Sequence, residues 1–256
     1  MRYARINHKG AAVWAAVNGS DVQILDGDPL HGDARPTGEV APLAEEALLI
    51  PVNPSKIFCL GRNYAEHVAE MGYQTPTTPS IFLKPPTALI GPGADVVLPR
   101  TDLSDEVEHE AELAVIIGRV TRNVSEADAL DYVFGYTCAD DVSARDLQRL
   151  DPNNTRGKGF DTFLPVGPWI ETELDLSSPQ TVRTRVNGEL RQDGHTGQMI
   201  HSVPFIISFI SQFSTLLPGD LLITGSPGGS GRIAPGDAVE IEVGGVGVLR
   251  HGVVAG

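Results

Sequence analysis

The chain has 256 residues, of which 41% are hydrophobic and 20% charged, a composition typical of a globular protein and not of a disordered one. Its formal net charge of -14 excludes nucleic acid and anionic membrane surfaces as favoured partners, because like charges repel. The sequence contains no apolar run of the roughly 18 residues that a membrane span needs, and its two cysteines and the lack of a signal-peptide pattern predict a reduced, cytoplasmic protein.

Residues 1–52 are predicted to form a small, β-rich N-terminal domain. Apolar stretches at 11–17 and 21–25 flank Asn18-Gly19, a dipeptide that favours a tight hairpin turn. The segment PVNPSK contains two prolines and marks a boundary, so that residues 53–256 form the second predicted domain.

The second domain is predicted to be a β-rich α+β structure with few helices. The strand candidates are KIFCL, SIFLK, DVVLP, ELAVIIG, DYVFGYTCAD, a hairpin around Asn187-Gly188 and the glycine-rich C-terminal stretch from residue 220 onward. One short helix is predicted at 65–71, and a second, apolar helix follows Ser202, which can cap it.

Acidic residues alternate along EHEAELAVII, residues 108–117. Side chains two positions apart on a strand point to the same face, so Glu108, Glu110 and Glu112 share a face that continues into Ala114 and Ile116. A carboxylate that enters an apolar core must be paired, neutralised or bound to a cation.

A further pair of acids, Asp140 and Asp141, ends a later strand candidate. Two glutamates and one aspartate suit a hard cation such as Mg2+ or Mn2+, and leave about half of an octahedral shell for substrate and water. From the spacing alone, an edge strand with solvated acids is an equally good interpretation. Zinc fits less well, because His109 lies on the opposite strand face and the sequence has no HExxH or CxxC pattern.

From about Lys56 to its C-terminus, the chain resembles the fumarylacetoacetate hydrolase family. The motifs that carry the resemblance are GRNYAEHVAEMG, FLKPPTALIGPG, HEAELAVIIG, DDVSARDLQ, KGFDTFLPVGPW, VNGELRQ and LLITGSPGG. The N-terminal piece resembles the small extra domain of the shorter bacterial members. The resemblance implies a mixed β-roll or β-sandwich fold, a homodimer and one Mg2+ or Mn2+ per subunit.

The resemblance also implies which acids hold the metal. It assigns this role to Glu110, Glu112 and Asp141, and makes Glu108 and Asp140 neighbours of the site.

His67 and Glu70 lie three residues apart and share one face of a predicted helix. On spacing alone an ordinary surface pair is the simpler interpretation, but the resemblance implies a proton-handling pair on a helix that closes over the site. The polar stretch from Gly72 to Ser80 suits the hinge of such a lid. Lys158, which by itself is most simply a solvated lysine, is placed by the resemblance against the substrate oxygens.

Other cations and hydrogen-bonding residues are candidates for substrate binding: Arg62, Lys84, Arg145, Gln148, Thr224 and Ser226. Arg145 can equally form a structural ion pair with Asp146 or Asp141. The stretch TGSPGGSG can hold an anion through its N–H groups or be a plain turn.

Two segments that depart from the family pattern leave the choice of substrate open. The family loop usually reads like TGTPxGVG, whereas this chain has Ser226 and Ser230 in place of threonine and valine. His195 and His201 lie in a second variable segment and are predicted to be structural or rim residues.

Together these residues predict an enzyme that acts on a small anionic 2-oxo acid through an enolate stabilised by the metal. The first hypothesis is hydrolysis of a C–C bond in an acylpyruvate- or fumarylpyruvate-like substrate, with water activated by His67 and Glu70. The second is decarboxylation or isomerisation of an oxaloacetate-like or 2-hydroxyhepta-2,4-diene-1,7-dioate-like diacid. The third is a metal-binding module that has lost its chemistry.

Overall fold

The structure is a computed structural model that describes residues 1–70, 72, 74 and 77–256. Its α-helices are α1 (Ala65–Glu70), α2 (Arg145–Leu150), α3 (Thr155–Lys158) and α4 (Val203–Phe213). Its strands are β1 (Arg2–His8), β2 (Ala11–Asn18), β3 (Asp21–Asp26), β4 (Arg35–Pro42), β5 (Leu48–Leu49), β6 (Ile57–Gly61), β7 (Ser80–Lys84), β8 (Leu89–Ile90), β9 (Asp95–Leu98), β10 (Val107–His109), β11 (Ala111–Ile117), β12 (Val133–Asp140), β13 (Ser143–Ala144), β14 (Leu164–Glu171), β15 (Thr181–Val186), β16 (Glu189–His195), β17 (Leu221–Ile223), β18 (Gly231–Arg232), β19 (Ala238–Val243) and β20 (Gly247–Ala255). The predicted β-rich α+β class is confirmed.

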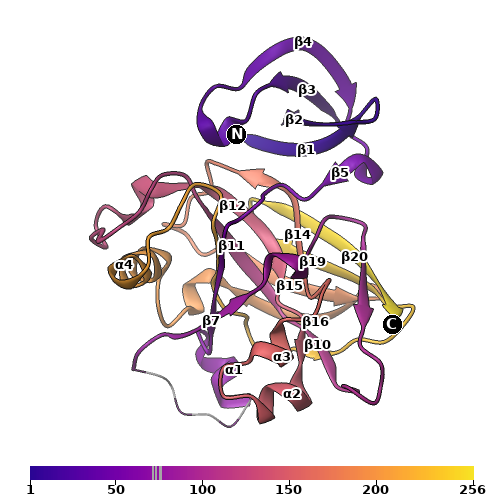
Figure 1. Ribbon diagram of the computed structural model, residues 1–256, viewed down its shortest axis with the longest axis vertical. Coiled ribbons are helices and arrows are strands. Elements are labelled where there is room, and N and C mark those ends of the chain that lie inside the picture. The colour runs from indigo at the N-terminus through magenta and orange to yellow at the C-terminus, as the bar shows by residue number, and fades with distance from the viewer. Residues whose placement is uncertain (71, 73, 75–76) are drawn as a thin grey trace.

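The strands form three sheets (Figure 1). The largest, of 12 strands, has the order β4-β3-β2-β1-β14-β12-β11-β17-β6-β7, with β5 and β8 paired to β1 and β14. A five-stranded sheet, in the order β16-β15-β19-β20-β9, packs against its centre, and a three-stranded sheet joins β13, β10 and β18. The apolar layer between the two larger sheets is the main core of the protein.

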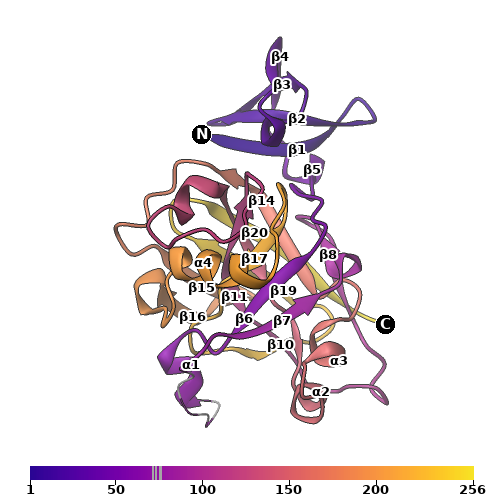
Figure 2. The ribbon, with the colours of Figure 1, turned by 60° about the vertical axis from the view of Figure 1, so that its left-hand side comes forward.

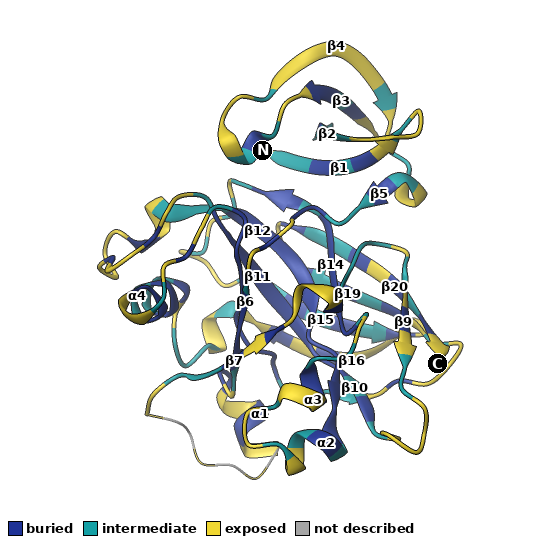
Figure 3. Cartoon of the chain, viewed as in Figure 1, coloured by how far each residue is buried: buried dark blue, intermediate teal, exposed yellow. Residues whose placement is uncertain are grey.

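Strand β11 lies at the centre of the fold, and all of its residues are buried (Figure 3). Leu113 and Val115 face the main core, whereas Ala114 and Ile116 face a second apolar cluster on the other side of the sheet. A strand covered on both faces needs apolar residues at every position. This double burial explains the unbroken apolar run that follows the acids in the sequence.

Helix α4 is the predicted apolar helix, and it begins as expected. Ser202 accepts a hydrogen bond from the N–H of Phe205 at 3.3 Å and so caps the first turn. One face of the helix, including Ile206 and Ile210, is buried in the main core.

Both predicted hairpin turns are present, but one is shifted by a residue. Asn187 and Gly188 join β15 to β16, and both have the positive φ angles of a type I′ turn, 53° and 80°. In the N-terminal hairpin, Asn18 pairs with Asp21 as the last rung of the ladder, so the turn residues are 19 and 20.

The first strands, β1–β5, form a layer with its own cluster of buried apolar residues. The layer is joined to the rest by pairing of β1 with β14, where Arg2 lies opposite Glu171. Figures 1 and 2 show it at the end of the molecule opposite α1, α2 and α3. The division into domains at residue 52 stays a prediction.

The acidic stretch is not the continuous strand that alternation predicts. The chain leaves one sheet and enters another at Glu110: β10 belongs to the three-stranded sheet, and β11 belongs to the largest. The N–H of Glu110 donates to the carboxylate of Asp140 at 2.7 Å, and its carbonyl accepts from the N–H of Asp141 at 2.9 Å. Glu108 therefore does not continue the face of Glu112.

Three other expectations concern membrane-spanning helices, the two cysteines and the predicted hinge. Within the described residues, no helix is both long and apolar enough to cross a membrane. Cys59 and Cys138 are buried and free, as expected of a chain with no disulfide framework. The predicted hinge between Gly72 and Ser80 includes residues 73, 75 and 76, which lie outside the described residues.

Candidate active site and metal centre

Three buried carboxylates meet where β11 begins and β12 ends. Glu110 directly precedes β11, Glu112 lies within it, and Asp141 directly follows β12. One ligand atom from each side chain lies within 4.8 Å of the others. Because β11 and β12 are antiparallel neighbours, the start of one strand and the end of the other lie side by side.

Buried cations neutralise two of these three acids. Lys158 donates to Glu110 at 2.7 Å and to Asp141 at 2.6 Å, and Lys84 donates to Asp141 at 2.6 Å. Arg145 lies 2.5 Å from Glu110. Burial alone would raise the pKa of Glu110, but the charges of Arg145 and Lys158 bring it well below its usual value.

Glu112 is in a different position, because its carboxylate accepts only the N–H of Gly225 among the described residues. Burial, and then the charges of Asp141 and Glu110, raise its pKa well above the usual value. A buried carboxylate that has two other carboxylates beside it and no cationic partner destabilises the fold unless a bound cation compensates its charge. This donor set of hard oxygens therefore fits Mg2+ or Mn2+.

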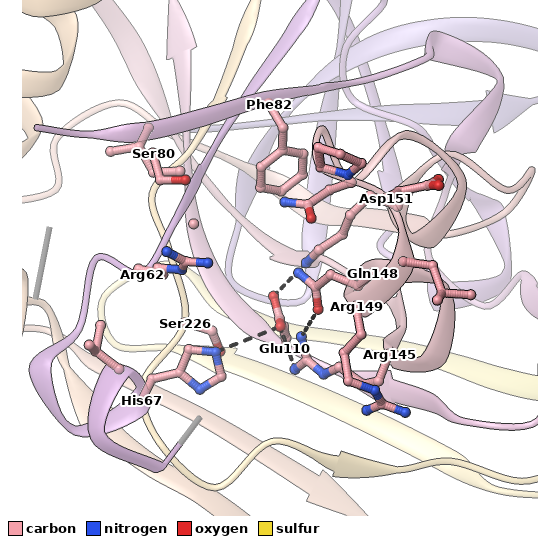
Figure 4. A pocket seen from close by; sticks show the side chains of 17 residues that line it. Arg62, His67, Ser80, Phe82, Glu110, Arg145, Gln148, Arg149, Asp151 and Ser226 are labelled. Atoms are coloured by element: carbon pink, nitrogen blue, oxygen red, sulfur yellow. Dashed lines mark hydrogen bonds and ion pairs between the residues drawn. The ribbon is translucent and has the colours of Figure 1, made fainter. Parts of the chain in front are cut away.

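A cavity of about 300 Å³ opens beside these carboxylates. Figure 4 shows His67 and Arg62 reaching toward Glu110 from one side of it, and Arg145 and Gln148 from the other. Seven of the predicted site residues line the cavity: Arg62, His67, Glu110, Arg145, Gln148, Lys158 and Ser226. The lining carries four lysine or arginine side chains and two acidic ones, an excess of positive charge that suits a small anion.

Two candidates for substrate binding do not line this cavity. Lys84 is fully buried and binds Asp141 and the carbonyl of Val142. Thr224 donates its hydroxyl proton to the carbonyl of Leu113 at 2.8 Å. Both side chains make internal bonds, and their predicted contact with substrate stays a prediction.

Arg145 forms ion pairs, but with acids other than those predicted. Its guanidinium binds Glu108 at 2.6 Å and Glu110 at 2.5 Å, whereas Asp141 and Asp146 were the expected partners. It also donates to Gln148 at 2.8 Å. Glu108, which does not share the strand face of Glu112, therefore binds the guanidinium of Arg145 at the cavity wall.

His67 lies at the cavity with its ring almost fully buried. Its Nε2 is 3.8 Å from Glu110, and its Nδ1 is 4.0 Å from Glu70, too far for a hydrogen bond. The Glu70 carboxylate instead accepts the N–H of Gly229 at 2.9 Å. Burial, opposed by the charge of Glu110, lowers the pKa of His67, so the ring is neutral and can accept a proton at neutral pH.

Two buried polar residues behind the site, His251 and Gln192, were not predicted. His251 lies 2.9 Å from Asp140, whose other oxygen binds the N–H of Glu110. Gln192 contacts Ser226 and His109. A polar residue at an inward-facing position of an alternating strand can indicate a buried polar group. This pattern is not visible for Gln192, because its neighbours in the strand are also polar.

The two remaining histidines lie outside the cavity lining. His195 is exposed at the end of β16, and His201 stacks on Phe205 with ring centroids 5.0 Å apart. The side chain of Asn63 bonds the backbone N–H and carbonyl of residue 201. These contacts agree with the structural or rim positions predicted for both histidines.

Comparison with known proteins gives matches over nearly the whole chain. Residues 56–254 match the family described as fumarylacetoacetate (FAA) hydrolase C-terminal, and residues 1–51 match the family described as Rv2993c-like, N-terminal. Protein Rv2993c of Mycobacterium tuberculosis is 44% identical over an alignment of 267 positions, gaps included, which covers 99% of this chain and 98% of that protein.

Two solved structures bear on the site. The 2-hydroxyhepta-2,4-diene-1,7-dioate isomerase from Mycobacterium marinum is 42% identical, with a TM-score of 0.90 over 100% of this chain and 98% of its own. The fumarylpyruvate hydrolase from Pseudomonas aeruginosa, in complex with Mn2+ and pyruvate, is 31% identical, with a TM-score of 0.74 over 81% of this chain and 91% of its own.

Proposed function

Because the chain belongs to the fumarylacetoacetate hydrolase family, we propose that it is an enzyme dependent on Mg2+ or Mn2+ that forms the enolate of a small anionic 2-oxo acid. The observation that carries the proposal is the group of three buried carboxylates, Glu110, Glu112 and Asp141, beside a cation-lined cavity. The Mn2+ and pyruvate in the Pseudomonas aeruginosa structure support this assignment. When bound, the metal supplies a Lewis acid that stabilises negative charge on the 2-oxo oxygen.

The cavity lining supplies the groups that bind and orient the acid. Lys158 and Arg145 bring positive charge to the cavity wall beside Glu110, where they attract the substrate carboxylate. Ser226 adds a hydroxyl on the same lining. At about 300 Å³ the cavity is at the small end of ligand sites, which favours a compact substrate.

His67 is the base of the proposed reaction, because its neutral ring faces the cavity within reach of Glu110. In hydrolysis, the ring takes a proton from water, whose oxygen attacks the carbonyl of the acyl group. The C–C bond then breaks, its electron pair stays on the pyruvate fragment as an enolate, and that fragment takes up a proton at carbon. The products are a carboxylic acid and a 2-oxo acid.

Isomerisation or decarboxylation of a diacid is the second candidate. It is favoured by the 42% identity, over the full chain, to the Mycobacterium marinum isomerase. In isomerisation the same His67 ring would move a proton between two carbons, and no water enters the reaction. Decarboxylation would leave the same enolate after loss of CO2.

The assembly and location of the protein are also proposals. We expect a homodimer, which light scattering of the purified protein would test. The two free, buried thiols fit the predicted cytoplasmic location.

The deciding experiment is a product assay with Mn2+-loaded protein. Acetylpyruvate, oxaloacetate and 2-hydroxyhepta-2,4-diene-1,7-dioate are supplied separately, and acetate, pyruvate, CO2 and isomeric products are measured. Acetate plus pyruvate supports the hydrolase, whereas CO2 or a product of unchanged mass supports the second candidate. Glu110→Ala and His67→Gln should both abolish turnover, and only Glu110→Ala should weaken Mn2+ binding. Full Mn2+ occupancy without turnover of any of these acids would point to the binding module.

A further inference from the structure

Gln192 is a buried amide that connects three segments of the chain, one of which carries the cavity-lining residue Ser226. It lies on β16 and is 0% exposed. Its Nε2 donates to the hydroxyl of Ser226 and to the carbonyl of Pro227, both at 2.8 Å. Its Oε1 accepts the N–H of Ala111 at 2.9 Å and the hydroxyl proton of Thr184 at 2.7 Å.

The surroundings fix which way this amide points. The N–H of Ala111 can only donate, and the carbonyl of Pro227 can only accept. The amide oxygen of Gln192 must therefore face Ala111, and its NH2 group must face Pro227. The proton between Gln192 and Ser226 consequently belongs to the amide, and the serine oxygen is the acceptor.

This arrangement determines what the hydroxyl of Ser226 can still do. A serine hydroxyl carries one proton, and the Gln192 contact does not use it. Ser226 lines the cavity, and the only hydrogen bond of its hydroxyl among the described residues is the one that it accepts from Gln192. We infer that Gln192 is a positioning residue that holds Ser226 as a hydrogen-bond donor toward an oxygen anion of the substrate. The inference rests on the proposed function, because it takes a 2-oxo acid or its enolate as the occupant of the cavity.

The same amide ties this donor to the metal-binding carboxylates. Ala111, which donates to the amide oxygen, directly follows Glu110 in the chain. The ring of His109, on the other side of Glu110, lies 3.1 Å from the same oxygen. The Gln192 amide therefore sets the position of Ser226 relative to Glu110. A substrate bound between these two residues would span the distance that separates them.

The inference is tested by a double-mutant cycle in the binding of oxalate, a planar dianion that resembles the enolate of pyruvate. Titration calorimetry on Mn2+-loaded protein compares wild type, Gln192→Met, Ser226→Ala and the double variant. Ser226→Ala should weaken oxalate binding about 10-fold, the loss expected for one hydrogen bond to a charged oxygen. Gln192→Met should cause a similar loss, and the double variant should bind no more weakly than Ser226→Ala.

A purely structural role for Gln192 would give a different result. The two losses would then multiply in the double variant, and Mn2+ affinity would fall with Gln192→Met alone; either result would overturn the inference. Gln198→Met, the same change at an exposed position of the chain, is the control and should leave both affinities unchanged.

Two further measurements keep the test decisive. If Gln192→Met does not fold, Thr184→Val removes one donor to the amide oxygen. It should weaken oxalate binding about 2- to 3-fold in wild type and not at all beside Ser226→Ala. A crystal structure of Gln192→Met gives a result that does not depend on any substrate: an unchanged Ser226 side chain overturns the inference. Failure of wild type to bind oxalate would count against the proposed function, while that structure would still decide the role of Gln192.

Discussion

Replacing Glu112 with glutamine should change stability in opposite directions with and without metal. Glu112 is fully buried and receives one backbone N–H, whereas Glu110 and Asp141 are each neutralised by buried cations. Glu112→Gln removes a charge that the metal-free protein does not compensate. It also removes one of the three carboxylates that would hold the metal.

The geometry sets the size of both effects. Two unit charges 4.8 Å apart repel by about 3.5 kcal/mol at an effective dielectric constant of about 20. The neighbouring lysines offset part of this repulsion, and protonation of Glu112 relieves more. We therefore expect Glu112→Gln to raise the free energy of unfolding of the metal-free protein by about 1–3 kcal/mol. Wild type should gain about 2.7 kcal/mol from Mn2+ at 100 times its dissociation constant, and the variant should gain almost nothing.

Urea denaturation at pH 7.5, in EDTA and in excess Mn2+, measures all four free energies. Glu46→Gln, which removes one charge from an exposed position, is the matched control and should behave like wild type in both conditions. The variant should be more stable than wild type in EDTA and less stable in Mn2+. A variant that loses stability in EDTA, or that keeps the full stabilisation by Mn2+, would refute this account of Glu112.

Other parts of the fold give predictions that do not depend on the metal. Asp220 is fully buried, accepts hydrogen bonds from three backbone N–H groups and forms an ion pair with a lysine ammonium. Asp220→Ala should therefore lower the free energy of unfolding, measured by urea denaturation, by about 3–5 kcal/mol without changing Mn2+ affinity. Burial would raise the pKa of Glu171, but hydrogen bonds from a backbone N–H and from the N-terminal ammonium lower it. The ionised Glu171 carboxylate therefore stabilises the fold above about pH 4.5, and this stabilisation is lost as pH falls through the lowered pKa. Glu171→Gln should therefore be less stable than wild type at pH 7, and the two denaturation curves should converge as pH falls through the lowered pKa of Glu171. A Cβ on Gly228 would meet the Glu70 carboxylate at 2.8 Å and the Glu66 side chain at 2.9 Å, so Gly228→Ala should shift these two side chains of α1 and lower kcat, whereas Gly231→Ala, with its nearest contact at 3.7 Å, should not.

Local rules predicted the elements that depend on neighbouring residues. The Asn187-Gly188 turn is present because both residues accept positive φ, and α4 begins where Ser202 can cap it. The buried run of β11 was also recognisable, since a strand covered on both faces is apolar throughout.

The site could be predicted only as far as pattern and resemblance reach. The convergence of Glu110, Glu112 and Asp141 was expected and is present, but their roles as metal ligands stay a prediction. The break of the strand at Glu110 was not predicted, because the N–H of Glu110 donates to the carboxylate of Asp140, which lies 30 residues later in the chain. The partners of Arg145 and Lys84 were missed for the same reason: tertiary proximity decides which carboxylate a cation binds.

The break in the strand at Glu110 also bears on how such a protein can diversify. The backbone of Glu110 is bonded on one side to Asp140 and on the other to Asp141, so two of the acids are held to each other by main-chain contacts. The opposite wall of the cavity comes from α1, α2 and the stretch after α2, none of which belongs to the central strands. Substitutions in those outer segments can therefore reshape the substrate pocket while the acids keep their spacing. If the proposed function holds, a lineage built on this plan can change which substrate it accepts while the three carboxylates keep their arrangement.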